Sequence, residues 1–283
     1  MKESIRKLSG FSAAFRLDFA EALRSRWALL CALLYAGLGC VFVLVGMRES
    51  ALLGFTGTSR VLLGTTHLLL LILPLLALSA TAQVINRARE EGALELWLSQ
   101  PIRRTDYILA VALSRYVVLT APYVIILALL GVVSTLWFAS SISWLVLGRA
   151  IAVGAALNAS FVGLGVALSS FLATPTRSAT TAIFAWLIAV VLVDFGLIGA
   201  MLQWRLQPQA VFALAVINPV QAARMALLSA QDPELSILGP VGFYLTHKIG
   251  PSPLFIIGVA WPIAAGALAW TAGWMRIRRG DVV

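Results

Sequence analysis

The side chains that could carry out chemistry in this 283-residue chain are few and far apart. Its only histidines are His67 and His247, and its two cysteines, Cys31 and Cys40, stand at a spacing that matches no metal site. None of the three lysines follows a glycine, so the Gly-Lys pair of a phosphate-binding P-loop is missing. The residues therefore predict no catalytic site, no metal site and no cofactor bound by this chain.

One acidic residue, Asp194, lies well inside a long apolar run. An unpaired carboxylate is costly in lipid, so Asp194 is a candidate intramembrane polar site. A proton-carrying role would make the chain a proton-driven secondary transporter, which is the alternative function. Pairing with an arginine such as Arg149 or Arg205 would instead give Asp194 a structural role. The residues favour the structural role, because a proton relay normally needs several such groups.

Composition places the chain among membrane proteins. Its residues are 60% hydrophobic and 12% charged, whereas soluble domains are roughly 45–50% apolar and about 25% charged. The net charge of +9 suits basic flanks that face anionic lipid. No soluble stretch is long enough to bind nucleic acid, so we expect an all-α polytopic membrane protein with no nucleic-acid partner.

Six apolar segments are long enough to cross a bilayer, which takes about 20 residues per helix. They are residues 27–47, 61–84, 116–139, 151–173, 179–202 and 254–274. If both termini are cytoplasmic, fifteen Lys and Arg residues lie on the cytoplasmic side and six lie on the outer side. The six outer residues are Arg48, Arg60, Arg149, Arg205, Arg224 and Lys248. The excess of basic residues on the side of the termini predicts that both termini are cytoplasmic.

Two flanking segments are expected to have structure of their own. Residues 4–26 place apolar side chains at helical spacing between basic ones, which predicts an interfacial helix on the cytoplasmic side. Residues 203–253 form a long extracytoplasmic connection, and connections of this length usually carry structure or function. Within it, NPVQAARMALLSA (218–230) favours a short amphipathic helix at the outer interface, with a docking surface for an extracytoplasmic partner.

A compact charged stretch, residues 87–100, separates the second and third apolar segments. Its residue types favour helix, and Pro101 ends it. Helical spacing predicts an apolar ridge and an acidic flank, formed by Leu94, Trp97 and Leu98 and by Glu91 and Glu95. A short amphipathic helix between two membrane helices is suited to sit in a groove of a partner protein.

The run from Glu91 to Pro101, EGALELWLSQP, resembles the E-x-G-[ST]-L-E-x-L-L-x-x-P signature of ABC-2 type ABC transporter permeases. The chain departs from that signature at Ala93, where the family has Thr or Ser, and at Trp97, where Leu is common. The continuation, residues 103–109, is similar to the basic and polar return of the family to its third membrane helix.

This resemblance implies a type V exporter-like fold with six membrane helices, and a non-catalytic subunit in the bacterial cytoplasmic membrane. The partner would be a separate ABC ATPase subunit that binds ATP and Mg²⁺, commonly in an assembly of two permeases and two ATPases. Residues 87–100 would be the coupling helix, and Thr174–Arg177 would form a second, smaller contact. The implied contact residues are Glu91, Gly92, Leu94, Glu95, Trp97, Leu98, Pro101 and Arg177.

Within the family, the chain looks most like the permeases of nitrous-oxide-reductase maturation systems (NosY-like). The grounds are its size, the long connection before the last membrane segment, and Asn218-Pro219 followed by Arg224. This likeness implies a periplasmic accessory protein that receives mechanical work during copper-site maturation, with Asn218, Pro219 and Arg224 as contacts. Other ABC-2 members export drugs, lipids or glycans, so export and mechanical transmission both stay open.

Overall fold

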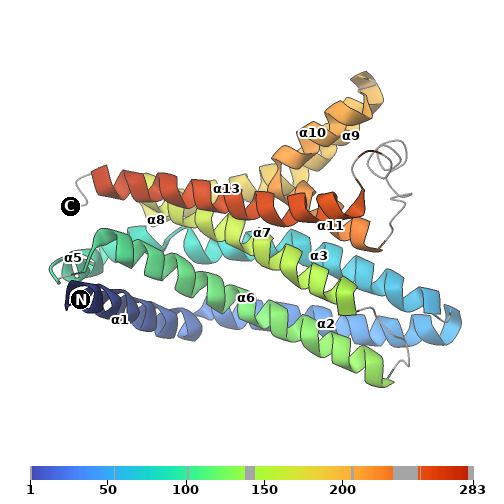
Figure 1. The fold of residues 1–283 in the computed structure, drawn as a ribbon, viewed down its shortest axis with the longest axis horizontal. Helices are drawn as coiled ribbons and strands as arrows, with labels where there is room; N and C mark the ends of the chain where they lie inside the picture. The colour runs from blue at the N-terminus through green and yellow to red at the C-terminus, as the bar shows by residue number, and fades with distance from the viewer. Residues whose placement is uncertain are drawn as a thin grey trace.

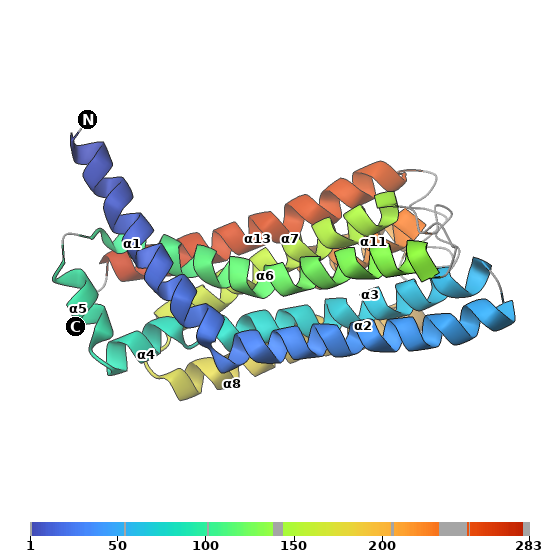
Figure 2. The ribbon, with the colours of Figure 1, turned by 90° about the horizontal axis from the view of Figure 1, so that it is seen from below.

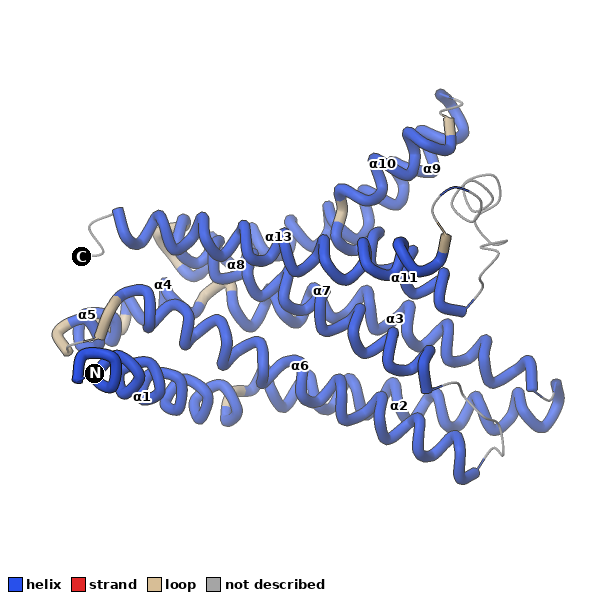
Figure 3. Tube along the Cα trace, viewed as in Figure 1, coloured by secondary structure: helices blue, strands red, loops and turns tan. Residues whose placement is uncertain are grey.

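A computed structural model describes residues 2–53, 55–100, 102–137, 144–204, 207–231, 248 and 250–279. Throughout these residues the chain is helical, and they contain no strand (Figures 1 and 3). The helices are α1 (Lys2–Arg24), α2 (Arg26–Leu53), α3 (Phe55–Thr81), α4 (Val84–Glu90), α5 (Ala93–Leu98), α6 (Arg104–Trp137), α7 (Trp144–Phe171), α8 (Pro175–Leu187), the π-helix η1 (Ile188–Leu192), α9 (Val193–Trp204), α10 (Pro208–Ile217), α11 (Pro219–Gln231) and α13 (Pro251–Arg279).

The long helices α2, α3, α6, α7 and α13 lie side by side in a bundle (Figures 1 and 2). In the described residues, five helices are long and apolar enough to cross a membrane, and the bent pair α10–α11 can make a sixth. The five are His67–Glu90, Arg104–Val133, Trp144–Phe171, Pro175–Leu197 and Pro251–Arg279. The chain is therefore an all-helical multi-pass membrane protein, as its composition indicates.

The helices extend beyond the apolar segments seen in the sequence. The third segment was expected to begin at residue 116, but α6 begins at Arg104, and α7 begins at Trp144 rather than 151. Hydropathy detects only the apolar middle of a membrane helix. The backbone hydrogen bonds of the helix continue into its polar ends. The fifth segment consists of three pieces, α8, η1 and α9.

The two ends of the bundle differ. The helices α1, α4 and α5 and the last turns of α13 gather at one end, which we call the α5 end (Figure 1). The first turns of α7 and of α13 lie at the opposite end. The α5 end therefore holds both the expected interfacial helix and the expected coupling segment.

Small residues bring α7 and α13 together along the most extensive helix contact in the bundle. A Cβ on Gly163 would lie 2.2 Å from the Gly266 carbonyl oxygen, and a Cβ on Gly266 would lie 2.6 Å from that of Ala159. The stripe of Ala159 and Gly163 in α7 thus permits close approach of two backbones, as such stripes do in membrane helices.

Substitution of Gly163 by Ala is expected to lower stability by about 2 kcal/mol, because the new methyl group would overlap the backbone of α13. The midpoint of thermal unfolding in detergent measures the effect. Gly148 of the same helix has no atom within 4 Å of an added Cβ, so Gly148→Ala is the matched control. Equal midpoints for the two variants would contradict the close packing of α7 and α13.

The helix α11 is present where the sequence favours a helix, but its described side chains are not exposed as a docking surface. It packs against α13, α7 and α3, and Ala222, Ala223 and Leu227 are at most 2% exposed. The chain bends by 117° between α10 and α11, so α11 turns back into the bundle. The physical reason is residue size, since α11 meets α13 at Gly258, where an added Cβ would lie 2.2 Å from that of Ala226.

Candidate functional site

The segment expected to be one coupling helix over 87–100 is two helices, α4 and α5. Gly92 separates them with a φ of 69°, in the left-handed region that side chains other than glycine rarely adopt. The amide of Gly92 donates to the Arg89 carbonyl at 3.2 Å, which closes the last turn of α4. Gly92 therefore sets the direction in which α5 leaves α4.

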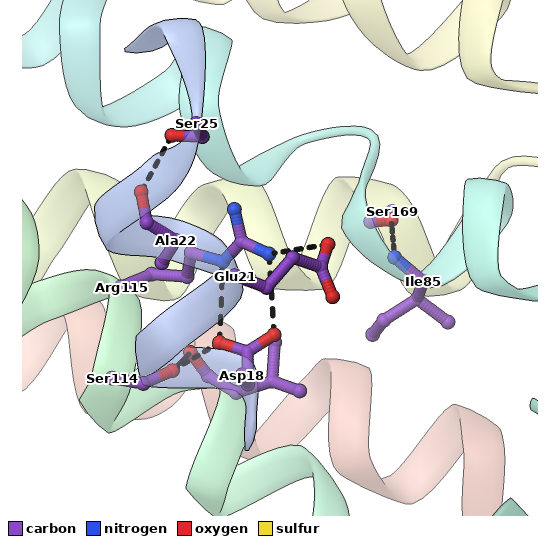
Figure 4. A network of polar contacts seen from close by, with 9 residues as sticks. Asp18, Glu21, Ala22, Ser25, Ile85, Ser114, Arg115 and Ser169 are labelled. Atoms are coloured by element: carbon purple, nitrogen blue, oxygen red, sulfur yellow. Dashed lines mark hydrogen bonds and ion pairs between the residues drawn. The ribbon is translucent and has the colours of Figure 1, made fainter. Parts of the chain in front are cut away.

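The helix α4 is fastened to α7 and α8 by buried polar contacts. The backbone N–H groups of Ile85 and Asn86 donate to Ser169 Oγ of α7 at 2.8 and 3.2 Å (Figure 4). The side-chain amide of Asn86 lies 2.5 Å from Ser178 Oγ of α8. These groups are fully buried, and buried polar groups that lose their partners are costly. We therefore expect α4 to move together with α7 and α8.

Leu94 does not belong to an outward-facing ridge, so that part of the sequence interpretation is wrong. Its side chain is 3% exposed and lies in a cluster with Ile85, Tyr107 and Ile108. The ring of Trp97, which is half-buried, lies 6.0 Å from the ring of Tyr107. After the turn at Gly92, α5 packs against the start of α6, and Leu94 and Trp97 make this contact.

The outward face of α5 is formed by Glu95 and Leu96. Leu96 is 70% exposed, and Glu95 is exposed beside it, as is Glu91 before the turn. Residues two apart on a helix point in nearly opposite directions, so a buried Leu94 requires Leu96 to face outward. Sequence reasoning missed Leu96, and the side chain of Leu98 and all of Pro101 lie outside the described residues.

A polar latch joins α1 to α6 at the same end. The Arg115 guanidinium lies 3.2 Å from the Asp18 carboxylate and 3.4 Å from that of Glu21, and Ser114 Oγ also donates to Asp18 (Figure 4). The Arg115 and Asp18 side chains are 9% and 12% exposed. Sequence reasoning missed this contact, because Asp18 and Arg115 are 97 positions apart and no local pattern joins them.

Replacement of Arg115 by Met is expected to lower stability by about 3 kcal/mol, because it leaves the shielded Asp18 carboxylate without its ionic partner. Thermal unfolding measures the loss, and limited proteolysis should show faster cleavage within α1. Arg16 is exposed on α1, so Arg16→Met is the matched control. A proteolysis rate unchanged by Arg115→Met would show that α1 is held by other contacts.

The helices α1 and α5 border a shared cavity of about 220 Å³. Side chains from α1, from the end of α3, from α4 and α5, and from α6 line it. Its charged residues are Asp18, Glu21, Arg87, Glu91 and Arg115. Because both helices border one cavity, a protein bound at α5 would lie next to α1.

The expected second contact, Arg177, lies in the first turn of α8. Thr174 caps this helix, and its Oγ1 accepts from the Arg177 backbone N–H at 3.4 Å. The Arg177 side chain is exposed, and α8 begins beside α4 (Figure 2). Arg177 is therefore accessible near the α5 end.

Asp194 pairs with an arginine, as the structural alternative requires, but the partner is Arg224. The Arg224 guanidinium lies 2.5 Å from the Asp194 carboxylate, and the Gln221 amide donates to the same carboxylate. The expected partner Arg149 lies instead over the ring of Phe255, 5.4 Å from its centroid. Arg205 lies outside the described residues.

Asn218 and Arg224, expected to contact an outside partner, both make contacts within the chain. The Asn218 amide donates at 2.5 Å to the carbonyl of Ala189 in η1, where the backbone leaves the regular α-helical hydrogen-bond pattern. Asn218 Oδ1 accepts from the Val220 N–H at 2.9 Å, and Pro219 begins α11. Together with the Asp194–Arg224 pair, these contacts fasten α11 to the fifth membrane segment.

The chain is similar in sequence to known transporter proteins. The family model of ABC-2 family transporter proteins matches residues 13–272. A protein of Pseudomonas aeruginosa named probable ABC transporter permease protein NosY is 28% identical over 261 residues, which cover 90% of this chain and 94% of that protein. A protein of the same name from Stutzerimonas stutzeri is 24% identical over 257 residues, with 87% and 91% covered.

Proposed function

Because this chain belongs to the ABC-2 family of transporter proteins and is an ABC transporter permease subunit, we propose that a separate ATPase subunit drives it through α5. The observation that supports this proposal is the outward pair Glu95 and Leu96 on a helix whose other side is buried in the chain's own core. ATP and Mg²⁺ would be bound by the ATPase. The exposed Glu91 and Arg177 would lie at the margin of the contact.

The bundle offers a physical route for the motion. Force on α5 would pass to α4 through the short turn at Gly92, and then to α7 and α8 through the contacts of Ser169 and Asn86. The helix α8 continues into η1 and α9, which hold α11 through Asn218 and Asp194. Movement at one end of the bundle would thus reach the bent pair α10–α11 at the other.

The remaining assembly follows from the same proposal. Two copies of this permease would join two ATPase subunits in the bacterial cytoplasmic membrane, with both termini on the cytoplasmic side. The bent pair would then act toward the periplasm, either in export or on an accessory protein in copper-site maturation. Asn218 and Arg224 make contacts within the chain. They would therefore act on such a protein indirectly, by holding α11 in position.

Co-expression with candidate ABC ATPase subunits from the same genome tests the proposal. Purification through a tag on the permease should recover both chains and an ATP hydrolysis activity that the permease alone lacks. Hydrolysis by the purified permease alone, or recovery of the permease without any ATPase, would contradict a division of labour between the two chains.

A further inference from the structure

A cleft of about 460 Å³ opens between the first turns of α7 and the first turns of α13. It is lined by Trp144, Leu145, Gly148, Arg149, Ser252, Phe255 and Ile256. Trp144, Leu145 and Ile256 are 57%, 64% and 62% exposed, so the chain's described residues leave the walls of this cleft uncovered. The first turns of both helices lie at the end of the bundle opposite α5 (Figure 1).

One cation, Arg149, lies in this cleft, whose lining is otherwise apolar except for Ser252. Its guanidinium lies over the Phe255 ring at 5.4 Å from the centroid, a cation–π contact that holds the group in position. Among the described residues it has no carboxylate partner within ion-pair distance. As far as the described residues show, the guanidinium N–H groups can therefore donate to a bound molecule.

The depth of Arg149 suits the level of the lipid head groups. It lies five residues after the start of α7, or about 8 Å at the helical rise, and Phe255 lies about 6 Å into α13. The two helices are 28 and 29 residues long, about 42 Å, whereas the hydrocarbon core of a bilayer is about 30 Å thick. Their ends therefore reach the interface, where Trp144 is also a favourable residue.

We propose that this cleft binds a phospholipid of the adjacent leaflet. The phosphate would accept hydrogen bonds from the Arg149 guanidinium, because charge-assisted contacts of arginine with phosphate are strong and often bidentate. An acyl chain would lie along Leu145 and Ile256. The apolar walls and the single cation match a molecule with one anionic group attached to hydrocarbon chains. This site is separate from α5, so it does not depend on the proposed coupling function.

Binding of defined lipids to the delipidated chain in detergent, measured by native mass spectrometry, tests this site. Phosphatidylglycerol should bind at least about tenfold more tightly than diacylglycerol with the same acyl chains, which lacks the phosphate. Arg149→Gln should remove this preference and Arg149→Lys should keep part of it. Arg103→Gln, at an exposed arginine of the α5 end, is the matched control and should leave the preference unchanged.

Two results would overturn the proposal. One is an equal preference for phosphatidylglycerol in wild type and in Arg149→Gln. The other is efficient disulfide cross-linking between two copies that carry Leu145→Cys, which would show that a second copy covers the cleft. Far-UV circular dichroism of Arg149→Gln should match the wild type, so that loss of binding is not a loss of fold.

Discussion

A permease carrying Glu95→Arg and Leu96→Asp is expected to lose its ATPase subunit while keeping its fold. Both side chains point outward from α5, so the change removes an apolar contact and reverses a charge without disturbing the core. Truncated interface hot spots cost about 2 kcal/mol or more each, and we expect the double change to weaken binding by at least about 100-fold. Co-purification and ATP hydrolysis of the complex measure the effect.

Two further variants sharpen this experiment. Glu95→Gln with Leu96→Met keeps the size of both side chains and reverses no charge, so it should retain most of the bound ATPase. Leu94→Ala should act differently, because it removes a side chain that is 3% exposed and so lowers stability by about 2–5 kcal/mol. Undiminished ATPase binding by the charge-reversed permease would show that the outward face of α5 is not the contact.

Neutralisation of Arg224 alone is expected to be more harmful than neutralisation of both members of its ion pair. Arg224→Leu leaves the Asp194 carboxylate with only Gln221 as partner. Because the Asp194 side chain is 33% exposed, we expect a loss of about 2 kcal/mol, below that of a fully buried pair. The double variant Asp194→Asn with Arg224→Leu removes both charges and should recover much of that loss. Thermal unfolding of the two variants in detergent compares their stabilities.

The same pair of variants separates the two readings of Asp194. If the carboxylate holds α11 on the fifth membrane segment, the double variant should regain ATP-dependent activity of the complex along with its stability. If Asp194 carries protons, the double variant should be stable yet inactive, and transport should persist without ATP in the wild type. A stable, inactive double variant would therefore favour the secondary-transporter alternative.

The membrane class and the position of the main helices could be predicted from local properties of the chain. An apolar run of about 20 residues must form its backbone hydrogen bonds within itself in lipid, so it becomes a helix whatever its neighbours are. The sequence also indicated an amphipathic helical segment at 87–100 and the start of a helix at Asn218-Pro219. Both signals are local, because proline and amphipathic spacing act within a few residues. The contacts of these segments were harder to predict.

The outward face of α5 depends on the rest of the fold. The helix has six residues, and both Leu94 and Leu96 are apolar, so periodicity alone could not rank one above the other. The left-handed turn at Gly92 and the surface offered by Tyr107 and Ile108 bury Leu94 and expose Leu96. The latch of Arg115 to Asp18 likewise joins residues that are 97 positions apart, beyond the reach of any local pattern.

By itself, the sequence determined that this chain crosses a membrane as helices and carries a permease signature, because hydropathy and short motifs act locally. Only the tertiary structure decided which arginine neutralises Asp194. The sequence suggested Arg149 or Arg205, whereas the bend of 117° between α10 and α11 brings Arg224 into contact. A partly buried charge takes the partner that the packed backbones place beside it, and that packing depends on small residues such as Gly258 and Ala226 from distant segments.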